Sequence, residues 1–408
     1  MGCASSAPQA HPAGFPSIDA PTPTTIINAA AQAALYDRRR DDTDGSQKAW
    51  LGCDGARLEA ALRIDEELGD SPMKLLDARF LIELYKRGGT LRRRQELPAT
   101  AFLTLEEVKQ LPKGGQFGDC LRICCASHPW HQPDCADPKG INLARLARFL
   151  EVLVSGSWSD ATYAILFDYA SLHQAPPQGE RTATEEELYR RSLTTIMHWY
   201  AHPKVMTLKL TELPPGYPNG FTFPQGVTPN ASNYFDRGWC FCESMVSAMC
   251  KASNLVVDLG KFTGAETDLG RAMLECAATR PPPLMPTNFE SVLSTETFSK
   301  KADEKIVAQL YADVFEEEMG KAEKLRYSKL KWGDEEVAVL CKVLASGTVR
   351  NLNELVLGHN EIGDAGCAAL AQVIRSGAVP KLARVDLYGN PASAAAMQSV
   401  RGAIASRK

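Results

Sequence analysis

Long apolar runs and an excess of either charge are both missing from this sequence. No stretch among its 408 residues approaches the roughly 18 consecutive apolar residues that a membrane-spanning helix needs. The formal net charge is −4 and no Lys/Arg block is long enough to act as a basic arm, so the chain has no general attraction for nucleic acid. We therefore expect neither a membrane-spanning helix nor a nucleic-acid partner.

Cysteine is too sparse for a disulfide scaffold, with 12 in the whole chain. Several lie inside apolar runs, as in LRICCA at 121–126, where cysteine usually serves as a small buried hydrophobe. The N-terminus also lacks the apolar core of a signal peptide. These features predict a cytoplasmic protein in a reducing compartment.

The first six residues, MGCASS, carry a lipidation pattern. Gly2 follows a removable Met and Ser6 lies four residues later, which fits N-myristoylation, and Cys3 is placed for palmitoylation. Because one acyl chain anchors a protein only marginally whereas two hold it stably, this pair predicts attachment to the cytoplasmic face of a membrane. The alternative is a chance Met-Gly start on a flexible tail, and it stays open.

Shifts in composition divide the chain into five expected segments. These are a flexible tail (1–45), a helical N-terminal extension (46–115), an α/β domain (116–265), a helical connector (266–325) and a repeat segment (326–408). Within the extension, Ser71-Pro72 is typical of a helix start and Gly88-Gly89 of a helix end.

The α/β domain is predicted from an alternation of two patterns. Apolar runs alternate with stretches of helical spacing, which predicts a parallel sheet with helices on both faces. The apolar runs are 121–127, 162–172, 205–210 and 254–260, and the helical stretches are 141–154, 185–201 and 237–253. A long loop rich in Pro, Gly and Asn, 213–233, precedes the last of these helices, and loops of that length are usually functional or disordered.

The repeat segment shows a pattern that recurs after 30 residues. Leucines and an asparagine spaced as L-x-x-L-x-L-x-x-N span 352–360, and the same spacing with one Val spans 382–390. This pattern resembles leucine-rich repeats of the ribonuclease-inhibitor type, in which a short strand, a turning Asn and a helix recur. The resemblance implies a protein partner. About two and a half repeats are present, fewer than usually stand alone, so we expect them to pack on the preceding helices. The alternative is a longer array cut short.

Zinc-ligand residue types gather between positions 120 and 135 without the spacing of a known zinc motif. The cluster comprises Cys120, Cys124, Cys125, His128, His131 and Cys135. Cys124 and Cys125 are adjacent, so in a strand they point to opposite faces. We expect a buried strand followed by a loop, with no metal and no cofactor; a metalloenzyme is a weaker alternative. Nucleotide-binding glycine loops and a G-x-S-x-G elbow are also absent.

The stretch DRGWCFCES, residues 236–244, places one carboxylate in an apolar setting. On a helix, Trp239, Cys242 and Val246 share one apolar stripe, and Glu243 projects along it. Such a carboxylate usually has a raised pKa, a cationic partner or a ligand. The cationic alternatives within the chain are Arg237 and Lys251.

The two cysteines of this stretch are not candidates for chemistry. Cys240 and Cys242 point about 200° apart around a helix, so they cannot form a disulfide with each other or share a metal. Attention therefore moves from the thiols to the carboxylate beside them.

Three stretches resemble heterokaryon-incompatibility-like domains, which are relatives of TIR domains. They are RICCASHPWHQPDCADPKG (122–140), AILFDYASLHQ (164–174) and YFDRGWCFCE (234–243), and the resemblance covers about residues 115–262. Trp239 to Glu243 matches the W-C-x-x-E signature of plant TIR domains. The loop 213–233 and the loop after residue 127 depart from standard TIR loops.

The resemblance implies a flavodoxin-like sheet, self-association and cleavage of NAD⁺ as a substrate. Glu243 would be the catalytic residue, stabilising an oxocarbenium-like state as the ribose–nicotinamide bond breaks. The residues that the resemblance assigns to substrate binding are Ser127, His128, Trp130, Asp168 and Trp239. The sequence therefore favours a signalling or stress-sensing protein with NAD⁺ hydrolase activity, and the alternative is a non-catalytic repeat protein that acts as a scaffold.

Overall fold

The computed structural model describes residues 55–112, 120–156 and 162–406; the lipidation residues Gly2 and Cys3 lie outside these ranges. The described chain is an α/β protein with one six-stranded and one three-stranded sheet. The strands are β1 (Leu75–Asp77), β2 (Phe102–Leu103), β3 (Ile123–Ser127), β4 (Ala164–Phe167), β5 (Met206–Lys209), β6 (Val256–Asp258), β7 (Lys324–Arg326), β8 (Glu354–Val356) and β9 (Arg384–Asp386).

Helices connect and cover these strands. They are α2 (Gly55–Leu62), α3 (Ala78–Lys86), α4 (Leu105–Gln110), α5 (Ile141–Ser155), α6 (Asp168–Ser171), α7 (Ala183–Ala201), α8 (Gly238–Met249), α9 (Leu269–Glu275), α10 (Pro286–Leu293), α11 (Asp303–Lys321), α12 (Asp334–Ala345), α13 (Asp364–Arg375) and α14 (Ala394–Ala405). Helix α7 begins with a capping box, in which the Thr182 hydroxyl accepts from the backbone of Glu185 and the Glu185 carboxylate accepts from the backbone of Thr182. No helix of the described ranges has both the length and the apolar character needed to cross a bilayer.

The six-stranded sheet has the order β2-β1-β4-β3-β5-β6. Strands β4, β3, β5 and β6 run parallel, which confirms the four apolar runs predicted as strands, whereas β1 is antiparallel to both of its neighbours. The sheet is therefore mixed, and the prediction of a wholly parallel sheet was wrong. From β3 the chain passes through α5 to β4, which lies on one side of β3 in the sheet. It then passes through α7 to β5, which lies on the other side of β3. The connections thus diverge between β3 and β5, where open α/β sheets bind their ligands.

The N-terminal extension supplies strands as well as helices. The predicted helix start at Ser71-Pro72 was wrong, because residues 75–77 instead pair with β2 and β4 and are completely or almost completely buried. The helix starts later, where the Asp77 carboxylate accepts from the Arg79 backbone N–H at 2.8 Å. Gly88 adopts φ 70° just after α3, which confirms the predicted helix end.

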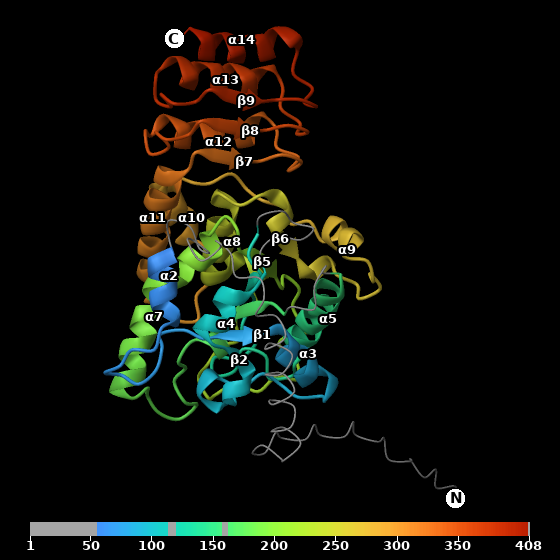
Figure 1. Ribbon diagram of the computed structural model, residues 1–408, viewed down its shortest axis with the longest axis vertical. Helices are drawn as coiled ribbons and strands as arrows, with labels where there is room; N and C mark the ends of the chain where they lie inside the picture. The colour runs from blue at the N-terminus through green and yellow to red at the C-terminus, as the bar shows by residue number, and fades with distance from the viewer. Residues whose placement is uncertain (1–54, 113–119, 157–161, 407–408) are drawn as a thin grey trace, which may run out of the picture.

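Side chains from the two faces of the large sheet enter separate apolar clusters. Cys124 joins the cluster formed with α3 and α5, and Cys125 joins the cluster formed with α7 and α8, as the alternation of a strand predicts. The second cluster continues through α10 and α11 into the repeat segment. Figure 1 shows α11 beside α7 and α8, with the repeat units stacked beyond them.

The repeat segment consists of three stacked strand–helix units. Strands β7, β8 and β9 are parallel, and their register pairs Leu325 with Leu355 and Leu355 with Val385. The Asn360 amide oxygen accepts from the backbone N–H groups of Leu330 and Trp332, and its NH₂ donates to the carbonyls of Tyr327 and Leu357. The 30-residue interval is confirmed, and each unit packs on the one before it, starting from α11.

Candidate functional site

Polar residues line the carboxyl edge of the parallel strands. Ser127 ends β3, Lys209 ends β5 and Asp258 ends β6, and the register pairs them directly across the sheet. Asp168 follows β4 immediately and begins α6. The edge where ligands bind in open α/β folds therefore carries a hydroxyl, an amine and two carboxylates.

Glu243 lies on α8, against this edge. Its carboxyl oxygen Oε2 accepts a hydrogen bond from the Ser127 hydroxyl. The Ser127 Oγ is also 2.5 Å from the Tyr234 hydroxyl. A serine hydroxyl has one proton, so when Ser127 donates to Glu243 it accepts from Tyr234. The three side chains form one buried hydrogen-bond chain, and Glu243 is 5% exposed.

The surroundings of Glu243 favour its neutral form. Burial, and next the charge of Asp168, raise the pKa of the Glu243 carboxyl well above its usual range, although hydrogen bonds from Ser127 and Tyr200 act in the opposite direction. Among the described residues, no Lys, Arg or His side chain forms an ion pair with it.

The two cationic partners considered from the sequence are occupied elsewhere. Arg237 donates to the backbone carbonyls of residues 130, 230 and 232. Lys251 donates to the backbone carbonyls of residues 202 and 205. An ion pair between Glu243 and either residue is therefore contradicted, and the acid faces hydroxyls instead.

A second group of predicted residues gathers around Asp168. The indole N–H of Trp130 donates to Asp168 Oδ2 at 2.9 Å, and the Nε2 atom of His128 lies 3.3 Å from Oδ1. Burial lowers the pKa of His128, whose ring lies against Phe167 with centroids 3.9 Å apart and the ring planes tilted by 33°. The Asp168 side chain is 26% exposed, so it is more accessible to a ligand than Glu243.

Trp239 does not join either group through its polar atom. Its indole N–H donates to Asp303 Oδ2 of α11 at 3.0 Å, and its ring is partly buried against the same cluster as α10 and α11. The structure thus brings together Ser127 with Glu243, and His128 and Trp130 with Asp168, while Trp239 ties α8 to the connector.

The long loop before α8 covers the same edge of the sheet. The Tyr217 hydroxyl donates to the His131 carbonyl at 2.8 Å, and Phe221 packs edge-on against the His131 ring at 5.6 Å. The Lys139 ammonium lies 4.0 Å from the centre of the Phe221 ring. The loop therefore packs on the segment that follows β3, and it ends in the short 3₁₀ turn Tyr234–Asp236 that closes over Ser127.

The sequence did not single out Tyr234 or Lys209. Tyr234 lies within the quoted signature, but its contact with Ser127 depends on the path of the long loop. Lys209 lies at the end of the predicted strand VMTLKL, where a lysine usually reaches solvent; here it is 1% exposed and its Nζ donates to the Ser244 hydroxyl at 2.7 Å.

The two cysteines beside Glu243 have separate surroundings. Cys240 and Cys242 have different neighbours, the His128 carbonyl and the Met197 sulfur, which agrees with their predicted divergence. Burial raises the pKa of both thiols well above the usual value. Within the part of the chain that is described, no three His, Cys, Asp or Glu side chains are grouped as metal ligands would be.

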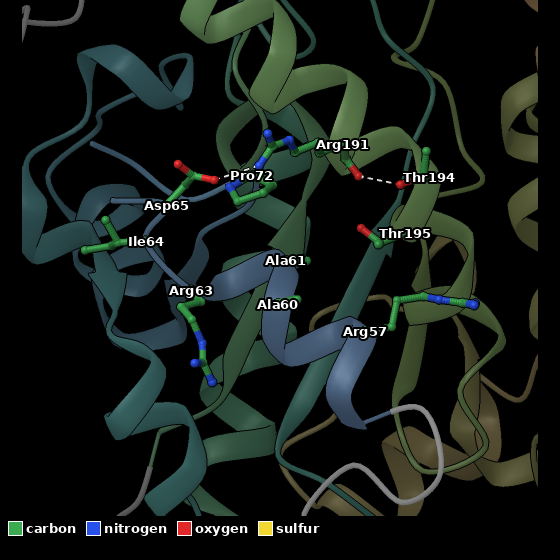
Figure 2. Close-up of a pocket in the computed structure, with 10 residues that line it drawn as sticks. All are labelled: Arg57, Ala60, Ala61, Arg63, Ile64, Asp65, Pro72, Arg191, Thr194 and Thr195. Carbon is green, nitrogen blue, oxygen red and sulfur yellow. Dashed lines mark hydrogen bonds and ion pairs between the residues drawn. The ribbon is translucent and has the colours of Figure 1, made fainter. Parts of the chain in front are cut away.

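A surface hollow of about 390 Å³ lies elsewhere, between α2 and α7. Figure 2 shows Arg191 reaching across it to Asp65, to which it is ion-paired at 2.7 Å. None of the predicted site residues lines this hollow. Comparison of the chain with models of known protein families and with curated proteins finds no match.

Proposed function

We propose that this chain is a signalling protein whose α/β domain hydrolyses NAD⁺ at the ribose–nicotinamide bond, with Glu243 as the catalytic residue. The observation that carries the proposal is the position of Glu243, hydrogen-bonded to Ser127 beside the point where the sheet connections diverge. The order β4-β3-β5-β6 is also that of the first four strands of a flavodoxin-like sheet, which supports the kinship with TIR domains.

The chemistry follows from the charge of the substrate. NAD⁺ carries a positive nicotinamide ring, and a cation bound beside Glu243 would favour the ionised carboxylate. That carboxylate would then stabilise the positive charge that develops on the ribose as nicotinamide departs with the bonding electron pair, before water adds to the ribose carbon. Asp168, His128 and Trp130 would contact the substrate at the neighbouring strand end.

Access to Glu243 requires a movement of its cover. Ser127 is 0% exposed and Tyr234 is 1% exposed, so substrate reaches the acid only when the turn Tyr234–Asp236 leaves Ser127.

The proposal also includes the repeat segment. Its three strand–helix units support leucine-rich repeats that bind a protein partner, and self-association accompanies signalling.

The burial of Glu243 favours one competing function, a non-catalytic scaffold. In that case the hydrogen-bond chain from Tyr234 through Ser127 to Glu243 only fixes α8 on the sheet, and the repeats carry the whole activity. Both functions fit the same fold, and they differ in whether Glu243 catalyses a reaction.

The test is release of nicotinamide from NAD⁺ by the purified full-length protein at high concentration, measured by chromatography. The matched variants are Glu243→Gln and Glu318→Gln, since Glu318 is an equally buried glutamate on α11. We expect the wild type and Glu318→Gln to release nicotinamide, and Glu243→Gln to be slower by about 100-fold or more. Equal turnover in all three, or none in any, would contradict catalysis by Glu243 and favour the scaffold.

A further inference from the structure

The amine of Lys209 is buried and has no anionic partner among the described residues. Among the described residues no carboxylate lies within ion-pair distance of its Nζ, whose hydrogen-bond partner is the neutral Ser244 hydroxyl. Burial, followed by the charge of Arg280, lowers its pKa to about 7, while Asp258 acts in the opposite direction. A buried charge without a counter-ion is costly, so a side chain kept in this position calls for a specific explanation.

Arg280 is a second buried cation that acts on Lys209. Among the described residues its guanidinium donates to neutral oxygens, the carbonyls of Ala248 and Arg326 and the hydroxyl of Ser253. The carboxylate of Asp258 is already engaged by Thr211 and by the backbone of Gly260. Lys209 and Arg280 thus have no carboxylate partner among the described residues, and an added anion next to Lys209 would supply one.

The donors around Lys209 are arranged as in a phosphate site. Ser127 lies directly beside Lys209 in the register of β3 and β5, and Ser244 follows Glu243 on α8. Two hydroxyls and an ammonium thus surround the point where the sheet connections diverge. Lysine binds phosphate as a point charge, and hydroxyl groups donate to the remaining phosphate oxygens.

One short turn contacts both Ser127 and Lys209. The turn Tyr234–Asp236 places the Tyr234 hydroxyl on Ser127 and the Phe235 ring 5.7 Å from the Lys209 ammonium. Phe235 is 45% exposed, so the turn lies at the surface beside the buried amine. The movement that would uncover Glu243 would also uncover Lys209.

We propose that Lys209, with the hydroxyls of Ser127 and Ser244, binds the diphosphate of a nucleotide. The identification of this nucleotide as NAD⁺ rests on the proposed function, in which the adjacent Glu243 contacts the nicotinamide ribose. The diphosphate replaces the turn Tyr234–Asp236 as the neighbour of the amine and supplies the missing anion.

The test measures binding by calorimetry with the full-length protein. The ligands are ADP-ribose, inorganic pyrophosphate and nicotinamide riboside, which lacks the diphosphate. The variant is Lys209→Met, which keeps the length of the side chain and removes its charge. Lys251→Met is the matched control, because Lys251 is equally buried with a pKa also lowered to about 7, but it donates to two backbone carbonyls of its own chain.

We expect ADP-ribose and pyrophosphate to bind the wild type and Lys251→Met with equal affinity, and at least tenfold more weakly to Lys209→Met. Nicotinamide riboside should bind the wild type and Lys209→Met alike. Unchanged affinity of ADP-ribose for Lys209→Met, or no binding of it to the wild type, would overturn the proposal. Binding of pyrophosphate alone would overturn the nucleotide as the ligand. If Lys209→Met fails to fold, Lys209→Arg replaces it and should retain binding of ADP-ribose; loss in a folded Lys209→Arg protein would count against the site.

The experiment separates this inference from the proposed enzyme. Glu318→Gln should bind ADP-ribose as the wild type does, because Glu318 lies on α11 and belongs to none of the contacts assigned to the ligand. If NAD⁺ is not cleaved but Lys209→Met loses ADP-ribose, only the enzyme proposal fails. If NAD⁺ is cleaved and Lys209→Met binds ADP-ribose normally, only the diphosphate site fails.

Discussion

The neutral, buried state of Glu243 predicts how the stability of the protein depends on pH. Its usual pKa is 4.5, and in the folded protein the pKa is raised well above that value by burial and by Asp168. Above the usual pKa the unfolded chain releases this proton while the folded chain keeps it. Raising the pH therefore favours the unfolded state, until the pH passes the folded pKa and the loss is complete.

The perturbation is Glu243→Gln, which has nearly the shape of the protonated acid and does not titrate. One pKa unit corresponds to about 1.4 kcal/mol, so between the usual and the raised pKa the wild type should lose up to about 1.4 kcal/mol per pH unit relative to the variant. Titratable groups that do not contact Glu243 are present in both proteins and cancel in the difference.

The assay is urea unfolding followed by tryptophan fluorescence at a series of pH values. Glu187→Gln is the control, because hydrogen bonds from Arg190 and Arg191 lower the pKa of Glu187 to about 2. The Glu187 contribution is lost only as the pH falls below about 4.5, so its difference from wild type should stay nearly constant above that pH. A constant difference for Glu243→Gln as well would show that Glu243 is ionised in the folded protein and would refute the reasoning.

Two further substitutions test the packing around the site and the repeats. Asn360→Ala should lower the free energy of unfolding by about 3 kcal/mol, because two backbone N–H groups and two carbonyls lose their hydrogen-bond partner. The control is Asn353→Ala at an exposed position, which should cost less than about 0.5 kcal/mol in the same urea assay. Gly238→Ala places a Cβ 1.9 Å from the Phe298 ring and should cost about 1–3 kcal/mol; adding Phe298→Ala should make the Gly238→Ala step nearly neutral, and no such relief would contradict the clash.

The strands at the centre of the sheet could be predicted because of where they lie. Strands β3 to β6 are buried on both faces, so their residues form continuous apolar runs that a single sequence displays. Strands β1 and β2 have only three and two residues, and β1 pairs with β4, nearly 90 residues further on, so no local pattern marks them. The antiparallel part of the sheet therefore escaped prediction.

The candidate site also has one part that could be predicted from the sequence and one part that could not. The apolar stripe on α8 predicted that Glu243 lies in an apolar setting, because the spacing of a helix fixes which side chains share a face. Which groups face it was not predictable. Ser127 and Tyr234 come from segments more than 100 residues apart, and only the folded chain brings their hydroxyls together. Lys209 was missed because its burial depends on the turn Tyr234–Asp236 and on α8 rather than on its own strand.

Helix α8 also depends on residues outside the segment 116–265 that was expected to form a domain. Its first N–H, that of Gly238, donates to the Thr297 carbonyl at 2.9 Å in the connector. At its other end the Met249 carbonyl accepts from the Tyr327 hydroxyl of the first repeat unit at 2.5 Å, and the Ala248 carbonyl accepts from Arg280 at 2.6 Å. Helix ends need such partners, so a fragment ending at residue 265 would leave these groups to water. The helix that carries Glu243 is thus completed by the connector and the first repeat unit.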